Sequence, residues 1–179
     1  REGIVNYSAL ARKISIQAFG SKKYENAIKM ALVRLAEKIA EKEDDLEGKI
    51  LNVLNKSSLT IRSKIAVVIT TREVEGLKYL SFVESKGAIT YIVEENELEK
   101  IEKSQKRYIL KTETNLNLIS IHSPTEIEET PGVNAHILDA LSSEGINIVE
   151  FLSCYTDTLL VTKQADTKMA YEILNGLMS

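Results

Sequence analysis

The chain has 179 residues, of which 44% are apolar and 27% are charged, and its formal net charge is −3. This apolar content is enough for a packed core, and the mixed charge without long low-complexity stretches argues against disorder and against an obligate polyanion-binding tail. No apolar run reaches the roughly 18 residues that a membrane span needs, and the single cysteine, Cys154, cannot form an internal disulfide, so we expect a soluble, cytoplasmic protein.

Residues 1–56 are predicted to be a helical domain. In residues 24–42 the apolar side chains recur at steps of three and four, which places them on one face of a helix. A shorter helix is expected before it, ending near Gly20, and a third is expected around residues 46–55. The pattern predicts a compact bundle of three short helices, of helix-turn-helix or winged-helix type.

The same region is basic. Residues 1–40 carry eight Lys and Arg against three Glu, a local excess of five positive charges in a slightly acidic chain. One interpretation is DNA contact, because phosphate binding needs such cations whatever sequence is read. The other is packing or protein interaction, with residues 24–39 as a dimerisation helix. The candidate DNA-binding residues are Arg12, Lys13, Lys22, Lys23 and Arg34.

Residues 57–114 change to β-branched runs and predict the order strand, strand, strand, helix, strand. Strands are expected at residues 61–71, 78–84, 88–94 and 107–112. Gly87 supplies the positive φ of a tight hairpin turn.

Residues 115–179 predict the order βαββα, with strands at 115–122, 147–154 and 158–162 and helices at 133–143 and 166–177. The similar order in residues 57–114 suggests a degenerate internal duplication, in which the first module has lost one helix and the second lacks a closing strand. Strand exchange between the modules or with another chain could fill that gap. We therefore expect a dimer or larger homo-oligomer.

Three motifs in the last segment carry a family resemblance. A strand at residues 118–122 precedes Thr-Pro-Gly-Val at 130–133, and Glu-Gly-Ile-Asn-Ile follows at 144–148. At this spacing they resemble the ACT domains of aspartokinases and related amino-acid-sensing proteins, and residues 123–133 with 153–158 also resemble stand-alone archaeal ACT proteins. The resemblance implies ferredoxin-like modules with antiparallel sheets, paired side by side or face to face, with an effector amino acid at the pairing seam. The expected fold is α+β: a helical domain, a degenerate module at 57–114 and an ACT module at 115–179.

The candidate site is the turn at residues 130–133. Pro131 is expected near the first helical position, Gly132 allows close approach of the backbone, and free helix N–H groups favour a carboxylate. Upstream glutamates could hold an ammonium group, although a helix cap with a solvated acidic loop explains the same residues. The candidate ligand-binding residues are Glu128, Thr130, Pro131, Gly132, Val133, Asn147, Ile148 and Val149.

The sequence offers no cofactor motif, no metal-ligand spacing and nothing that requires a nucleophile–base pair, and it has no counterpart of the aspartokinase catalytic domain. We therefore expect a non-catalytic regulatory protein that binds an amino-acid effector and needs no cofactor or metal. Two outputs stay open. The protein is either a transcription regulator acting through residues 1–56 or a regulatory subunit docking on a biosynthetic enzyme, such as an amino-acid pathway kinase.

Overall fold

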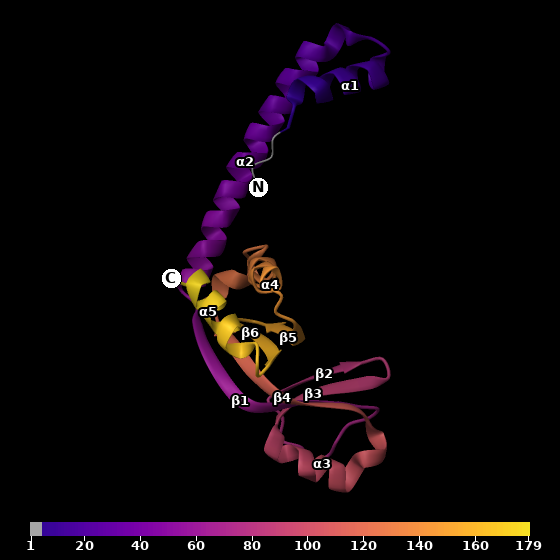
Figure 1. The fold of residues 1–179 in the computed structure, drawn as a ribbon, viewed down its shortest axis with the longest axis vertical. Helices are drawn as coiled ribbons and strands as arrows, with labels where there is room; N and C mark the ends of the chain where they lie inside the picture. The colour runs from indigo at the N-terminus through magenta and orange to yellow at the C-terminus, as the bar shows by residue number, and fades with distance from the viewer. Residues whose placement is uncertain (1–4) are drawn as a thin grey trace. The chain divides into compact units, whose positions relative to one another are not determined.

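The computed structural model describes residues 5–179, apart from the side chains of residues 40–44, 102, 104 and 105. The chain divides into two compact units, residues 1–49 and 50–179, and the boundary falls inside one long helix. The elements in chain order (Figure 1) are α1 (Tyr7–Phe19), η1 (Lys22–Tyr24), α2 (Glu25–Asn55), β1 (Ser58–Thr70), β2 (Ser81–Ser85), β3 (Ala88–Glu94), η2 (Glu95–Glu97), α3 (Leu98–Gln105), η3 (Lys106–Tyr108), β4 (Ile109–His122), η4 (Thr125–Glu128), α4 (Val133–Ser143), β5 (Ile148–Cys154), β6 (Asp157–Lys163) and α5 (Thr167–Leu177).

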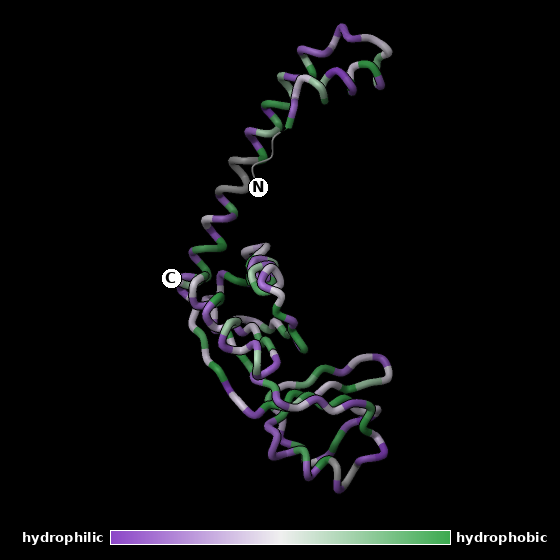
Figure 2. Tube along the Cα trace, in the orientation of Figure 1, coloured by the Kyte–Doolittle hydropathy of each residue, from purple (hydrophilic) through white to green (hydrophobic). Residues whose placement is uncertain are grey.

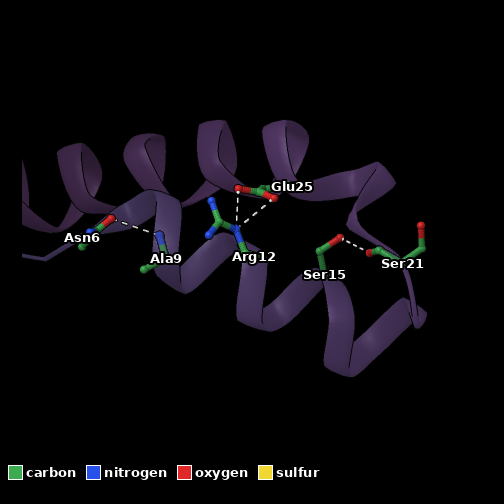
Figure 3. Close-up of polar contacts among 6 residues, drawn as sticks. All are labelled: Asn6, Ala9, Arg12, Ser15, Ser21 and Glu25. Atoms are coloured by element: carbon green, nitrogen blue, oxygen red, sulfur yellow. Dashed lines mark hydrogen bonds and ion pairs between the residues drawn. The ribbon is translucent and has the colours of Figure 1, made fainter.

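The first unit is a helical hairpin. Asn6 begins α1 by accepting a hydrogen bond from the Ala9 amide at 3.0 Å, and Gly20 ends it with φ 63°. The Ser15 hydroxyl donates to the Ser21 carbonyl at 2.6 Å, which anchors the turn into η1. Figure 3 shows α1 lying alongside the first turns of α2.

The prediction of three short helices is wrong, because α2 is continuous over 31 residues. The sequence suggested a break near residues 42–46, but this stretch contains no proline, and a single helical glycine such as Gly48 costs only about 1 kcal/mol. Between residues 5 and 57 the structure has no strand that could form a wing. Helices lying side by side also differ from the steep crossing of a helix-turn-helix unit.

The second unit contains one six-stranded antiparallel sheet in the order β2-β3-β1-β4-β6-β5. The two central strands, β1 and β4, are long, and each contributes to both halves of the sheet. Residues 58–62 of β1 pair with residues 118–122 of β4, and residues 65–70 pair with the earlier part of β4 and with β3. The position of the closing strand that the last module was predicted to lack is therefore filled by β1 of the same chain. Of the two predicted possibilities, this is strand exchange between the modules.

The predicted strands at 107–112 and 115–122 are one strand, β4. The polar residues between them produce a bend instead of a break, because Asn115 adopts a left-handed conformation with φ 58°. In β1, Lys64 does the same with φ 59°. The pairing between β1 and β4 shifts register at this level, so both strands bend together.

The two halves of the sheet share the same strand pairing and the same burial pattern. Ile65 pairs with Glu94 at the end of β3, and Leu116 pairs with Lys163 at the end of β6. From these residues onward β1 and β4 show the same burial pattern, as do β3 and β6 along their whole length. Both outer hairpins, β2–β3 and β5–β6, have two-residue turns.

Helices cover one face of the sheet at each end. In the first half, α3 packs Ile101 against β1 and β3. In the second half, the Asn117 amide and the Thr162 hydroxyl reach the Thr167 hydroxyl of α5 at 3.0 and 3.1 Å, so this face of β4 and β6 lies under the helices. The opposite, helix-free face forms a further cluster from both halves: Ile65, Val67, Ile92, Leu116, Leu118 and Val161.

Candidate functional site

The turn before α4 depends on Gly132. Its φ is 93°, and a Cβ at this position would lie 3.1 Å from the Cδ1 atom of Ile50 in α2. The close backbone approach predicted here is therefore to Ile50, within the protein's own core. Pro131 lies two residues before the start of α4, not at its first position. The Thr130 hydroxyl donates to the Glu126 carbonyl at 2.7 Å and closes the loop.

The acidic loop upstream of the turn is partly occupied by an ion pair. The Glu126 carboxylate lies 3.5 Å from the Lys56 ammonium. The pKa of Glu126 is lowered, first by a hydrogen bond from its own backbone amide and then by Lys56. Glu128 is exposed. This leaves Glu128 as the carboxylate of the candidate set that stands open to a ligand.

The candidate residues at the start of β5 lie in the same half of the sheet as the turn, but at the opposite end of the strands. Ile148 pairs with Thr162 near the end of β6, whereas His122, which precedes the turn, pairs with Asp157 at the start of β6. Asn147, Ile148 and Val149 therefore do not share a pocket with residues 130–133 of the same module.

A row of polar side chains links three strands beside the turn. His122 Nδ1 lies 2.7 Å from Asp157 Oδ1, and His122 Nε2 lies 3.2 Å from Thr60 Oγ1. A hydroxyl, an imidazole and a carboxylate in this order resemble a nucleophile with its base. The imidazole and carboxylate side chains are 46% and 50% exposed, however, so water competes for each contact and no enclosed site forms. We interpret the row as a cross-strand link that orients His122.

Asn134, in the first turn of α4, was not predicted as a site residue. Its amide donates to the Ser153 hydroxyl at 3.0 Å, and its carbonyl oxygen accepts from the Thr158 hydroxyl at 3.4 Å. The start of α4 is therefore fastened to the β5–β6 hairpin. Asn134 was not predicted because the motif at residues 130–133 ends one residue before it. Its partners, Ser153 and Thr158, are distant in sequence and cannot be identified from local patterns.

The first half of the sheet has a hollow at the corresponding position. Phe82 pairs with Tyr91 as Phe151 pairs with Leu160, so Glu84 corresponds to Ser153 and Ile89 to Thr158. No helix lies between β1 and β2, so nothing takes the place of Asn134. The resulting cavity has a volume of about 350 Å³ and is lined by Thr71, Arg72, Glu73, Phe82, Glu84, Ser85, Gly87, Ala88, Ile89 and Tyr91.

The lining of this hollow combines an aromatic floor with opposite charges. The ring of Phe82 is stacked near that of Tyr91, with centroids 6.0 Å apart. The Arg72 guanidinium lies 3.3 Å from the centroid of the Tyr108 ring, a cation–π contact that fixes its direction. With Glu73 and Glu84 in the same lining, the hollow offers a guanidinium for a carboxylate and two carboxylates for an ammonium. No local sequence pattern predicts this hollow, because it depends on the absence of a helix between β1 and β2.

Other classes of site receive no support from the described residues. Cys154 is exposed at the end of β5. In the part of the chain that the structure describes, no three His, Cys, Asp or Glu residues gather in a way that could hold a metal ion. Within the same residues, no helix combines the length and the apolar character needed to cross a membrane.

Solved structures similar to this chain share its fold. Aspartate kinase from Clostridium acetobutylicum matches with a TM-score of 0.58 and 15% identity over 68% of this chain, which spans only 35% of that enzyme. The ligand-free regulatory subunit of aspartate kinase from Thermus thermophilus matches with a TM-score of 0.54 and 13% identity over 68% of this chain and 96% of that one. A protein of unknown function from Vibrio cholerae matches with a TM-score of 0.57 and 14% identity over 74% of this chain and 98% of that one.

Sequence comparison is specific for one segment. No curated protein sequence matches the chain. Residues 111–176 match the family model of the ACT domain. This segment contains the Thr-Pro-Gly-Val and Gly-Ile-Asn-Ile motifs and nearly coincides with the expected module, so the resemblance to ACT domains drawn from these motifs is confirmed for residues 111–176.

Proposed function

We propose that this protein is a non-catalytic regulator that responds to a free amino acid bound at a seam between ACT modules. The match of residues 111–176 to the ACT domain carries the proposal. The common plan of the two sheet halves supports treating residues 57–114 as a degenerate second module, after a helical domain at residues 1–56 and before the module at 115–179.

The proposed ligand contacts come from two places in the module, which lie at opposite ends of its strands. The turn supplies Glu128, Thr130, Pro131, Gly132 and Val133, and the start of β5 supplies Asn147, Ile148 and Val149. These groups can meet around one ligand only if two modules contribute them, one from each side of a seam. The hollow beside Arg72 is a second candidate site for a zwitterion, because its lining carries both charges. Binding there would need no partner module.

A homo-oligomer remains part of the proposal on different grounds. The vacant position beside β4 no longer requires a second chain, because β1 fills it. The edge strand β2 still exposes Phe82 and Val83, each 46% exposed, and an edge with apolar side chains is usually covered.

For the output, we favour docking on an amino-acid pathway enzyme such as a kinase. The hairpin of α1 and α2 lacks the crossing of a helix-turn-helix unit, and Arg12, one of the candidate DNA contacts, pairs with Glu25 at 3.2 Å (Figure 3). Transcription regulation is the competing output. It predicts duplex binding that weakens steeply with salt and a shallower salt dependence after Lys22→Ala and Lys23→Ala.

The test is a melting-temperature screen of the whole chain against the twenty amino acids. A ligand at about one hundred times its dissociation constant stabilises the folded state by roughly 2.7 kcal/mol, which is about 5 to 10 °C for a chain of this size. A screen in which no amino acid moves the midpoint would reject the proposal.

Two sets of variants locate the ligand. Loss of the shift in Glu128→Gln and Asn147→Ala places it at the seam. Loss in Arg72→Ala alone places it in the hollow of the first module.

A further inference from the structure

An apolar seam runs along α2. Ile28, Leu32, Leu35 and Ile39 follow at steps of four, three and four residues, the spacing of a coiled-coil interface. At the same spacing the seam positions continue through Lys42, Leu46 and Lys49 to Val53, which is buried in the second unit. Hydrophobic and hydrophilic residues alternate along α2 in Figure 2, as such a stripe requires.

Within the helical hairpin this seam lacks a sufficient partner. Leu35 is 54% exposed and Ile39 is 47% exposed, whereas Ile28 and Leu32 are half-buried. Among the described side chains of residues 5–39, the buried ones are only Ala11 and Ser15. A helix gains most of its stability by burying its apolar face. A hairpin with so little core therefore needs a further apolar surface.

Charge along the helix indicates what that surface is. Residues 22–38 carry five Lys and Arg against two Glu, and residues 41–47 carry five acidic residues against one Lys. The change of sign falls directly after Ile39, the second of the two exposed seam residues. Two such helices side by side in the same direction would align like charges, whereas opposite directions align the basic segment of each with the acidic segment of the other.

We infer that two copies of this chain pair through α2 in antiparallel orientation, with Leu35 and Ile39 at the centre of the contact and the α1 helix of each copy flanking one end of it. An antiparallel pair uses the same patch on both copies, so a two-fold axis near Ile39 makes the surface complementary to itself. The pairing does not depend on amino-acid binding. It assigns the helical domain a role in assembly.

Leu35→Glu tests the seam, and the exposed residue Met30 provides a matched control. Met30 is 53% exposed but lies off the seam, two residues after Ile28. Analytical ultracentrifugation of the whole chain should show dimers whose dissociation constant rises by about tenfold or more in Leu35→Glu, equivalent to at least about 1.4 kcal/mol. Met30→Glu should leave it within about twofold. Equal effects of the two substitutions, or a dimer that Leu35→Glu leaves unchanged, would overturn the inference.

The orientation has its own test, because Cys154 is the only cysteine in the sequence. In a Cys154→Ser background, spin labels are placed at Lys29→Cys or at Lys38→Cys, both at exposed positions. With an axis near Ile39, the two labels at position 29 are separated by about 20 residues of helix, or about 30 Å along the axis. The labels at position 38 should lie much closer together. Short distances from both positions would indicate a parallel pair and contradict the antiparallel assignment.

Discussion

Lys64 in β1 and Asn115 in β4 share the same left-handed backbone conformation, and each stands directly before the buried half of its strand. The Asn115 amide donates to the Glu95 carboxylate at 2.9 Å, and its carbonyl accepts from the Gln164 amide at 2.9 Å. The two residues are the points at which both long strands bend.

The first prediction follows from the difference between their side chains. Asparagine tolerates positive φ, whereas lysine is strained there by about 1 kcal/mol. Lys64→Gly or Lys64→Asn should therefore raise the free energy of unfolding by up to about 1 kcal/mol. Asn115→Gly should change it less. Urea denaturation of the three variants measures both, and a larger gain at Asn115 would contradict this account of the bend.

Gly132→Ala should lower the free energy of unfolding by about 1 to 2 kcal/mol. Alanine at φ 93° is strained, and its Cβ would press on Ile50 at 3.1 Å. Gly48→Ala is the matched control, because Gly48 lies in α2 with nothing within 4 Å of its Cβ position. That substitution should raise helix stability by about 0.5 to 1 kcal/mol.

Thr167→Val should cost about 1 to 3 kcal/mol, because it leaves the buried Asn117 amide without its acceptor. The exposed Thr112→Val in β4 serves as the control and should stay within about 0.5 kcal/mol of the parent. Adding Asn117→Leu to Thr167→Val should recover part of the loss, as apolar replacement of both partners removes the unpaired group. A double variant as unstable as the sum of the singles would show that packing, not hydrogen bonding, matters here.

Glu150→Gln should stabilise the protein at neutral pH. Burial raises the pKa of Glu150 above its ordinary value of 4.5, a shift that Lys111 partly offsets and Glu113 reinforces. The charged form is thus disfavoured in the folded state, so stability is lost as pH rises through the raised pKa. The gain from Glu150→Gln should therefore be present at pH 7 and disappear below about pH 4. Glu144→Gln, at the exposed residue that follows α4, is the control and should change the free energy of unfolding at pH 7 by no more than about 0.5 kcal/mol.

Local patterns in the sequence were sufficient for several elements. The strand at 88–94 and the helix at 133–143 have the predicted bounds, and Gly87 has the positive φ expected of its turn. Each of these depends on side-chain periodicity or turn chemistry within a few residues. A close backbone approach at Gly132 was also predicted, and the neighbour that the structure shows there is Ile50.

Features that depend on distant pairing could not be predicted in the same way. The contact between Thr60 and His122 exists because β1 returns beside β4, and no local pattern encodes that. The polar residues 113–114 predicted a break because polar residues also mark turns, whereas β4 continues through them. The hollow at Arg72 arises from a missing helix, and the sequence shows only that the connection is too short.

The sharing of β1 and β4 also limits how the chain can be divided. Each half of the sheet takes its two central strands from segments that continue into the other half. A cut at residue 114 would leave residues 115–179 without β1 and residues 57–114 without the second part of β4. The halves are therefore not interchangeable cassettes: neither can be transplanted, swapped with a relative's module or lost without removing a central strand from what remains.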